Sequence, residues 1–422
     1  LDLPINEKLV EICKNLPICT EWPQVVIENC KHEAIFYVLK VNAVDTSKAL
    51  SAVDPSILVK TQFPMMPNVL TAKILHIFEI DFNLDEKERL VVLSQPFQKD
   101  NFVSTQINAV VPFQYLTRFQ QQQLVLKNPP LQFETCGHIA HYNLFTPEQF
   151  ALRNYIGMTT LDQNIKTVIL KTQPISNQFR TFEFVLIAGV EKYETTVQQN
   201  GFKLKLNLQT CYFNSRLQNE HEQVVEMIKN DPERGFVFDA TAGVGPFGIP
   251  LALSKINVLM NDLNVESYNY QLENIKLNNC QKYAKCLNQD SFQLIKEVVQ
   301  NPNQFFDMKC THIILNLPEL SVDFLSSLQN IKCDQRFFIE TFTRQKLHFV
   351  EDLLVRATAA KKGWDFVFDE LKMENQIVEG FGCDVFDIKD LDKDEIRKFQ
   401  RFYKEFEVQI VRDVGTTKWM VR

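Results

Sequence analysis

The chain has 422 residues, a length at which roughly two to four domains are expected. Hydrophobic residues make up 45% and charged residues 23%, which excludes an intrinsically disordered protein, and no apolar run approaches the roughly 20 residues of a membrane-spanning helix. The formal net charge of −7 argues against a protein that binds nucleic acids through its overall charge, but it is compatible with a local basic surface.

Residues 1–125 are predicted to form a small α+β accessory domain. Short apolar runs, such as Val25–Ile27 and Leu90–Leu93, alternate with polar segments in this part of the chain. A glutamine-rich stretch, Phe119–Gln123, is followed by a linker near Asn128-Pro129-Pro130. No cluster of residues typical of catalysis stands out here, so we expect this domain to assist the chemistry of another one.

Residues 126–212 are predicted to form a second, mainly antiparallel domain. The runs 165–170, 182–186 and 202–208 are rich in β-forming residues, and the last alternates polar and apolar side chains. From position 163 to 216 there are seven basic residues against three acidic ones, a local charge of +4. A surface that contacts an RNA backbone and an ordinary solvated sheet face both fit this pattern.

Residues 213–422 alternate between strand and helix patterns, which predicts a doubly wound parallel α/β sheet. The final stretch, residues 407–411 and 418–421 around Gly415, predicts an antiparallel hairpin at the edge of this sheet. The expected parallel strands cover residues 236–238, 257–260, 285–287, 311–315 and 336–341.

A glycine-rich loop follows the first of these strands. Only 12 glycines occur in the chain, yet three of them lie in Gly243-Val-Gly245-Pro-Phe-Gly248. This spacing matches a nucleotide-binding turn, in which glycines let the backbone approach the ligand and the next helix presents unpaired N–H groups. Many strand-to-helix turns contain glycines, so the loop alone does not identify a ligand.

Acidic residues at three strand ends favour a positively charged nucleoside ligand. Asp239 directly precedes the loop, where it suits a cation better than a pyrophosphate. Asp262 follows the second strand, nineteen residues after Gly243, where an acid accepts hydrogen bonds from ribose hydroxyls. Asp290 follows the third strand, near an adenine edge. This set favours S-adenosylmethionine over a dinucleotide, although each acid could instead cap the following helix, as Asp290 alone could.

The fourth strand ends in Asn316-Leu317-Pro318. Methyltransferases that act on a planar nitrogen place a short Asn-x-Pro turn at this point, where its side-chain and backbone carbonyls hold the base beside the sulfonium. An ordinary strand-ending turn is the commoner explanation of such a tripeptide taken alone.

Together these blocks resemble the tRNA (guanine-37 N1)-methyltransferase family of eukaryotes and archaea. The resemblance covers about residues 130–320, and the first 125 residues contribute little to it. The chain departs from the family pattern at Ser215, where the family usually has proline, and at Thr241, where it usually has phenylalanine. The similar segments are Gly137–Leu144, Asn177–Phe182, Leu186–Gly189, Phe213–His221, Asp239–Phe247, Asn261–Asn264 and Asn316–Pro318.

The resemblance implies a class I (Rossmann-like) methyltransferase domain and a metal-free reaction. N1 of guanine carries a proton at neutral pH, so methylation needs a base for that proton and a cation near O6. Glu220 would be the base, Arg180 the donor to O6, and Asn316 the holder of the guanine edge. Without the resemblance, Glu220 reads as a first-turn acid that complements a helix dipole. The cofactor would be lined by His221, Asp239, Gly243, Gly245, Asp262, Leu263, Asp290, Ser291 and Asn316, with Arg216 and Pro318 touching RNA.

The expected partner is tRNA, bound through its anticodon loop and, by residues 1–125, through its outer corner. A monomer without membrane attachment is expected. The ten cysteines form no C-x-x-C pair and no secretory signal is visible, which favours a cytoplasmic protein, with nuclear and mitochondrial forms left open. Two alternatives remain: transfer of the aminocarboxypropyl group of the same cofactor to a wyosine precursor, and an inactive RNA-binding relative.

Overall fold

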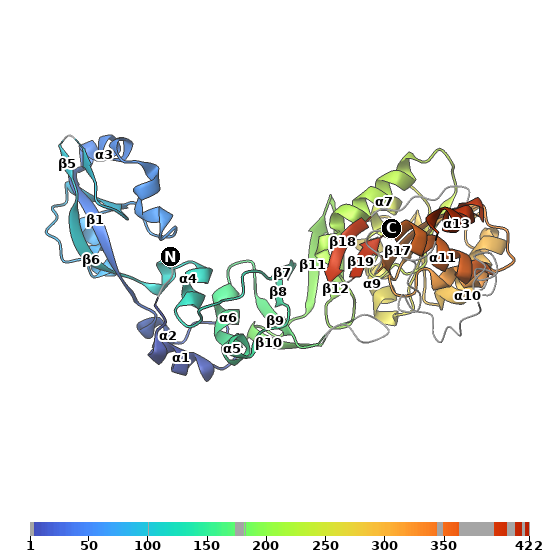
Figure 1. Cartoon of the computed structure of the whole chain (residues 1–422), viewed down its shortest axis with the longest axis horizontal. Helices are drawn as coiled ribbons and strands as arrows, with labels where there is room; N and C mark the ends of the chain where they lie inside the picture. The colour runs from blue at the N-terminus through green and yellow to red at the C-terminus, as the bar shows by residue number, and fades with distance from the viewer. Residues whose placement is uncertain are drawn as a thin grey trace. The chain divides into compact units, whose positions relative to one another are not determined.

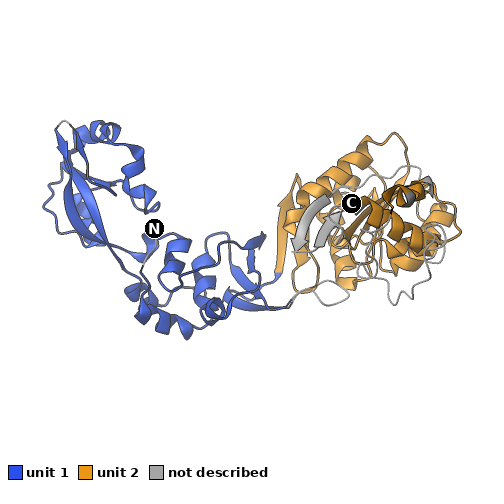
Figure 2. Cartoon of the chain, viewed as in Figure 1, with its two compact units in different colours: residues 1–174, 182–193 blue, residues 175–181, 194–422 orange. Residues whose placement is uncertain are grey.

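The computed structural model describes residues 4–99, 101–173, 181, 183–343, 349–362, 392–402, 410–415 and 418–421. The chain divides into two compact units, coloured separately in Figure 2. Residues 1–174 and 182–193 form the first unit, and residues 175–181 and 194–422 form the second. No helix in the described part is long and apolar enough to cross a bilayer.

The first unit contains two four-stranded sheets. One is antiparallel, in the order β2 (Val69–Leu70), β3 (Glu88–Leu93), β1 (His32–Asn42), β6 (Thr105–Val111). The other has the order β10 (Phe184–Gly189), β9 (Thr167–Lys171), β8 (Ile139–Tyr142), β7 (Glu134–Cys136), with only β8 and β9 parallel. The helices are α1 (Glu7–Lys14), α2 (Gln24–Asn29), α3 (Thr46–Ala52), α4 (Arg118–Gln123), α5 (Pro147–Ala151) and α6 (Arg153–Thr160).

One hydrophobic core runs across the boundary expected near residue 125. The ring of Tyr155 on α6 packs against Trp22 with centroids 5.5 Å apart, and its hydroxyl donates to the Gln121 carbonyl at 2.8 Å. The amide of Gly189 donates to the Cys19 carbonyl at 2.7 Å. The glutamine-rich stretch forms helix α4, which begins with a capping box, and the side-chain amide of Gln122 donates to Thr159 inside the fold. Residues 4–173 therefore form one unit.

The second unit is built on a seven-stranded sheet, as the strand and helix patterns predict (Figure 1). The strands β15, β14, β13, β16 and β17 are parallel, whereas β19 and β18 add an antiparallel hairpin at one edge. Of the predicted hairpin, residues 407–409 lie outside the described residues. In sheet order the strands are β15 (Ala284–Leu287), β14 (Val258–Asn261), β13 (Phe236–Asp239), β16 (Cys310–Asn316), β17 (Arg336–Thr343), β19 (Lys418–Val421) and β18 (Ile410–Gly415).

Helices connect the strands of this sheet, and the buried side chains of β13 and β16 form a core with two of them. The glycine loop leads into the short helix α8, as expected. The helices are α7 (Gln218–Asn230), α8 (Gly248–Leu253), α9 (Val265–Leu277), α10 (Ser291–Gln300), α11 (Phe349–Lys362) and α13 (Lys393–Arg397).

A two-stranded hairpin, β11 (Glu194–Gln199) and β12 (Phe202–Asn207), belongs to the second unit and not to the domain expected at 126–212. Asn274 of α9 and Asn278, which caps this helix at its C-terminus, accept hydrogen bonds from the hairpin backbone. The amide of Lys205 donates to Asn274 Oδ1 at 2.7 Å, and that of Lys203 to Asn278 Oδ1 at 2.9 Å. Bonds from a helix of the sheet domain explain why this hairpin lies with it.

Candidate active site at the carboxyl edge of the sheet

The carboxyl ends of the parallel strands bring the predicted polar residues to one edge. Asp239 is the last residue of β13, Asn316 is the last of β16, and Asp262 follows β14. The strand order reverses at β13, which pairs with β14 on one side and β16 on the other. Ligands of doubly wound sheets bind in the crevice outside such a reversal point.

The glycine loop folds back over this edge in an unusual backbone conformation. Gly243 and Gly245 have φ values of +52° and +100°, which residues with a side chain rarely adopt. At Gly245 an added Cβ would also lie 3.0 Å from Ile249 Cγ1. Gly245 is therefore required by the loop, and Gly243 adopts its left-handed conformation without the strain that a side chain would add.

Asp262 holds the loop closed. Its Oδ2 accepts a hydrogen bond from the Gly243 amide at 2.8 Å, and its Oδ1 accepts one from the Asn264 amide at 2.9 Å. Gln271 of α9 donates to the Gly243 carbonyl at 2.8 Å. Burial raises the pKa of Asp262, although these two amides oppose the shift. Each carboxylate oxygen keeps acceptor capacity for a ribose hydroxyl.

Asp239 is a buried carboxyl group without a well-aligned hydrogen-bond donor among the described residues. Its exposed fraction is 0%, and neither oxygen has a hydrogen bond of normal geometry in the described structure. Burial and then the nearby charge of Asp262 raise the pKa of Asp239 well above its ordinary value, and the poorly aligned Thr241 amide opposes this only in part. A buried acid without a partner at the head of a ligand loop suits a cationic ligand.

Asn261 is a structural residue of the site that the sequence analysis did not single out. Its side-chain amide donates to the Gln289 carbonyl at 2.9 Å and to Ser291 Oγ at 2.8 Å, and its Oδ1 accepts from the Gln289 amide at 3.0 Å. Because it is fully buried, it ties the ends of β14 and β15 together. A buried polar residue as the last of an apolar strand is the only sequence signal for this role.

The remaining residues predicted to line the cofactor, Asp290, Ser291 and Leu263, differ in their exposure to solvent. Asp290 is exposed and accepts a hydrogen bond from the Phe292 amide at 2.9 Å, so it caps α10, the alternative that the sequence left open. The hydroxyl of Ser291 points inward and donates to the Ala240 carbonyl. Leu263, by contrast, is 46% exposed beside Asp262 and is free to cover a flat ligand.

The Asn316-Leu317-Pro318 turn is fixed through its backbone. The Asn316 amide donates to Thr241 Oγ1 at 2.9 Å, and the Leu317 amide donates to Ser321 Oγ at 2.8 Å. The Pro318 carbonyl accepts from Thr341 Oγ1 at 2.9 Å, so it is directed toward β17. The side-chain amide of Asn316 has no partner in the described part of the chain, so it is available to a ligand.

Helix α7 carries Glu220 and His221 in its first two turns, and both are buried. The His221 ring contacts Phe247 of the glycine loop edge to face, with centroids 4.6 Å apart, and its Nδ1 has no hydrogen-bond partner among the residues that the structure describes. Burial lowers the pKa of His221 to about 4, so the ring is neutral at pH 7. Arg216 lies on the surface just before the helix. Arg180 lies outside the described residues.

Comparison with known proteins places these features in a family. Residues 195–362 match the family model of the TRM5/TYW2 methyltransferase domain. A tRNA (guanine(37)-N(1))-methyltransferase of Entamoeba histolytica is 32% identical over 65% of this chain and 73% of its own length. Those of Giardia intestinalis and Trichomonas vaginalis are 32% and 39% identical, over 72% and 47% of this chain. These two matches span 66% and 50% of the relatives' own lengths.

Two solved structures share the fold. Trm5b from Pyrococcus abyssi superposes with a TM-score of 0.54 at 21% identity, over 91% of this chain and 97% of that one. The Trm5 chain in a complex of aTrm5 with tRNALeu gives a TM-score of 0.55 at 15% identity, over 91% and 98%. At these identities the likeness concerns the fold alone.

Proposed function

The chain belongs to the tRNA (guanine(37)-N(1))-methyltransferase family, and from this premise we propose that it transfers a methyl group from S-adenosylmethionine to N1 of guanosine 37 of tRNA. The observation that carries the proposal is Asp239, a buried carboxyl group without a proper partner beside the glycine loop. It lies at the end of the strand next to the one that ends in Asn316, whose side-chain amide makes no hydrogen bond to the described residues.

The residues present fit the cofactor. Asp239 would face its positively charged methionine end, and Asp262 would accept hydrogen bonds from its ribose while it holds Gly243. Leu263 would cover one face of the adenine, and Gly245 leaves room for the backbone to approach. When bound, S-adenosylmethionine supplies an electrophilic methyl group on a sulfonium, so the chain needs to provide only a base and a positioned substrate.

Glu220 would accept the proton of guanine N1. It is buried in the first turn of α7, next to a neutral His221, so a proton acceptor at this position is shielded from bulk water. Arg180 would stabilise the charge that develops on O6, and the side-chain amide of Asn316 would hold the base edge. A base in a single-stranded loop can be turned out of its stack, which gives the site access to guanosine 37.

The substrate would be bound by both units. Arg216 would contact the anticodon-loop backbone and the first unit the outer corner of tRNA. Pro318 would add a contact from its ring, because its carbonyl is already bonded to Thr341. We further propose a monomer that acts in the cytoplasm, with nuclear or mitochondrial forms; gel filtration with light scattering and microscopy of a tagged chain test these two points.

One assay tests the reaction. The chain is incubated with unmodified tRNA and cofactor labelled either in the methyl or in the aminocarboxypropyl group, and the tRNA is digested to nucleosides. We expect methyl label in 1-methylguanosine, and none in tRNA with adenosine at position 37. If only the aminocarboxypropyl label reaches the tRNA, the alternative reaction is established. If neither label reaches it, the chain is an inactive relative.

In the same assay Glu220→Gln separates chemistry from binding. The substitution keeps the size of the side chain but removes the proton acceptor, so single-turnover methylation is expected to fall by about 100-fold or more. The dissociation constants for tRNA and cofactor should stay within about twofold of the wild type. An unchanged single-turnover rate would remove the role assigned to Glu220.

A further inference from the structure

A hollow of about 490 Å³ lies at the amino-terminal ends of the parallel strands, whereas the site described above lies at their carboxyl ends. It is bounded by the amino ends of β13, β14 and β16 and by the last turn of α7. None of the residues assigned to methyl transfer lines it. Its apolar lining comes from Ile228, Val237, Ile256 and Met308.

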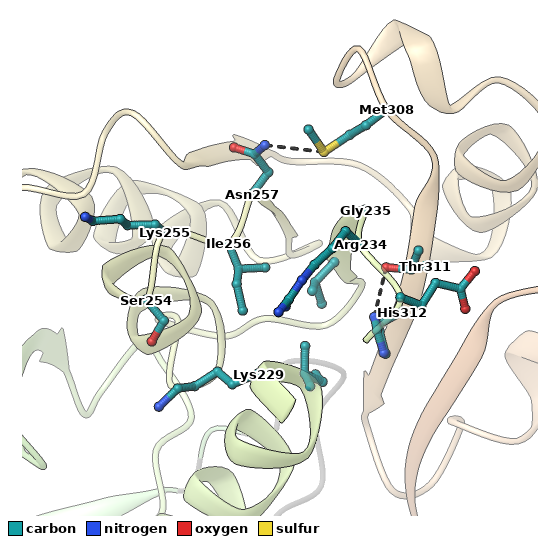
Figure 3. Close-up of a pocket in the computed structure, with 13 residues that line it drawn as sticks. Lys229, Arg234, Gly235, Ser254, Lys255, Ile256, Asn257, Met308, Thr311 and His312 are labelled. Atoms are coloured by element: carbon teal, nitrogen blue, oxygen red, sulfur yellow. Dashed lines mark hydrogen bonds between the residues drawn. The ribbon is translucent and has the colours of Figure 1, made fainter. Parts of the chain in front are cut away.

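Three basic side chains, Lys229, Arg234 and Lys255, line this hollow (Figure 3). Arg234 and Lys255 are exposed and make no ion pair within the described structure, whereas Lys229 pairs with Glu226 on its own helix. The carboxylate in the lining, Glu233, is paired with Lys309. The hollow therefore carries an excess of positive charge, with two cations available to a ligand.

The side chains of His312 and Thr311 in the wall of the hollow are engaged in contacts within the protein. His312 Nδ1 lies 2.9 Å from Thr311 Oγ1, and its Nε2 lies 3.0 Å from Asp231 Oδ2. Asp231 also pairs with Arg336. Burial lowers the pKa of His312 although Asp231 opposes the shift, so the ring is neutral at pH 7. The charge in the hollow thus comes from the three basic side chains.

We propose that this hollow binds a nucleotide unit, with Arg234 and Lys255 as separate phosphate-binding groups on its wall and the sugar or base over the apolar lining. The volume lies within the roughly 300–1,000 Å³ typical of small-ligand sites. Arginine and lysine are the usual phosphate ligands in proteins, and exposed cations without partners bind phosphate at little desolvation cost. The same chemistry is offered by a free nucleotide and by a nucleotide of an RNA strand, and the site is independent of the proposed methyl transfer.

The test compares Arg234→Glu/Lys255→Glu with a control of the same charge change, Lys296→Glu/Lys393→Glu. Both control lysines are exposed helix residues outside the hollow. The probes are cytidine 5′-monophosphate, measured calorimetrically with the cofactor pocket saturated by S-adenosylhomocysteine, and a 12-nucleotide oligouridylate, measured by fluorescence anisotropy at several salt concentrations. Circular dichroism and thermal midpoints check the fold, and Arg234→Gln/Lys255→Gln replaces the double variant if it unfolds.

We expect the hollow variant to bind at least one probe about tenfold more weakly than the control variant. Loss of monophosphate binding would identify a free nucleotide as the ligand. Loss confined to oligouridylate, with a salt slope lower by about 1.4 for two lost phosphate contacts, would identify an RNA strand. Equal affinities of the hollow and control variants for both probes would overturn the proposal.

Discussion

Thr241 connects the glycine loop to the turn that follows β16. Its hydroxyl accepts a hydrogen bond from the Asn316 amide, and its own backbone lies between Asp239 and Gly243. From the sequence this threonine is only a departure from the family pattern. In the structure it positions the backbone of the residue whose side chain is proposed to hold the base.

Thr241→Val tests this positioning. The change conserves volume but leaves the part-buried Asn316 amide without an acceptor, which costs about 1 kcal/mol. We expect kcat for methyl transfer to fall about tenfold with little change in the cofactor dissociation constant, and Thr241→Ser to restore most of it. If kcat is the same in the valine variant, the hydrogen bond has no part in positioning Asn316.

Asp239 is expected to lower the free energy of unfolding at pH 7 while it strengthens the binding of S-adenosylmethionine. Its folded pKa is raised, so the stability that it contributes is present at low pH and is lost as the pH rises above its unfolded pKa, near 3.8. Asp239→Asn removes this loss and should increase the free energy of unfolding at pH 7. The same change should weaken S-adenosylmethionine binding about tenfold or more, measured by calorimetry. An asparagine variant that is less stable and binds normally would contradict both assignments.

His221 makes stability depend on pH in the opposite sense. Its folded pKa of about 4 lies below the ordinary 6.5, so below pH 6.5 the unfolded chain binds a proton that the folded chain does not. Between pH 7 and pH 5 the wild type should lose about 2 kcal/mol more unfolding free energy than His221→Gln. Chemical unfolding at the two pH values measures the difference, and parallel losses would mean that the ring is not buried as described.

At the scale of elements, the alternation of β13 to β17 with helices was predictable because each buried strand is a short apolar run bounded by polar turns. Helix α11 was not predicted. Its own buried residues, such as Leu354, Val355 and Ala359, lie on several faces of the helix. The single apolar stripe that marks an amphipathic helix is therefore missing from its sequence.

The site was predictable where one strand end fixes one side chain, and not where several elements converge. Asp239 and Asp262 follow directly from their strands. The inward hydroxyl of Ser291 and the role of Asn261 depend on contacts between β13, β14 and β15, which residue order alone does not determine. The boundary at residue 125 failed for the same reason, since Cys19 and Gly189 are bonded across 170 positions.

At the scale of the whole molecule, two units with separate cores are expected to unfold in two steps. S-adenosylhomocysteine at about 100 times its dissociation constant should stabilise the second unit by about 2.7 kcal/mol and leave the first unchanged. Calorimetry should therefore show one shifted and one constant transition, and no shift in Asp262→Ala. A single transition that moves as a whole would show that the units unfold together.

Asn274 gives the second unit one more property. Its side chain bonds the backbone of Lys205 in the hairpin and also donates to the Val244 carbonyl in the glycine loop, at 3.0 Å. A single amide thus spans two surfaces that would meet different ligands. Linkage is reciprocal, so if a ligand in the glycine loop strengthens RNA binding at the hairpin, RNA at the hairpin must strengthen cofactor binding by the same free energy. The affinities for the two substrates would then be coupled through the side chain of Asn274.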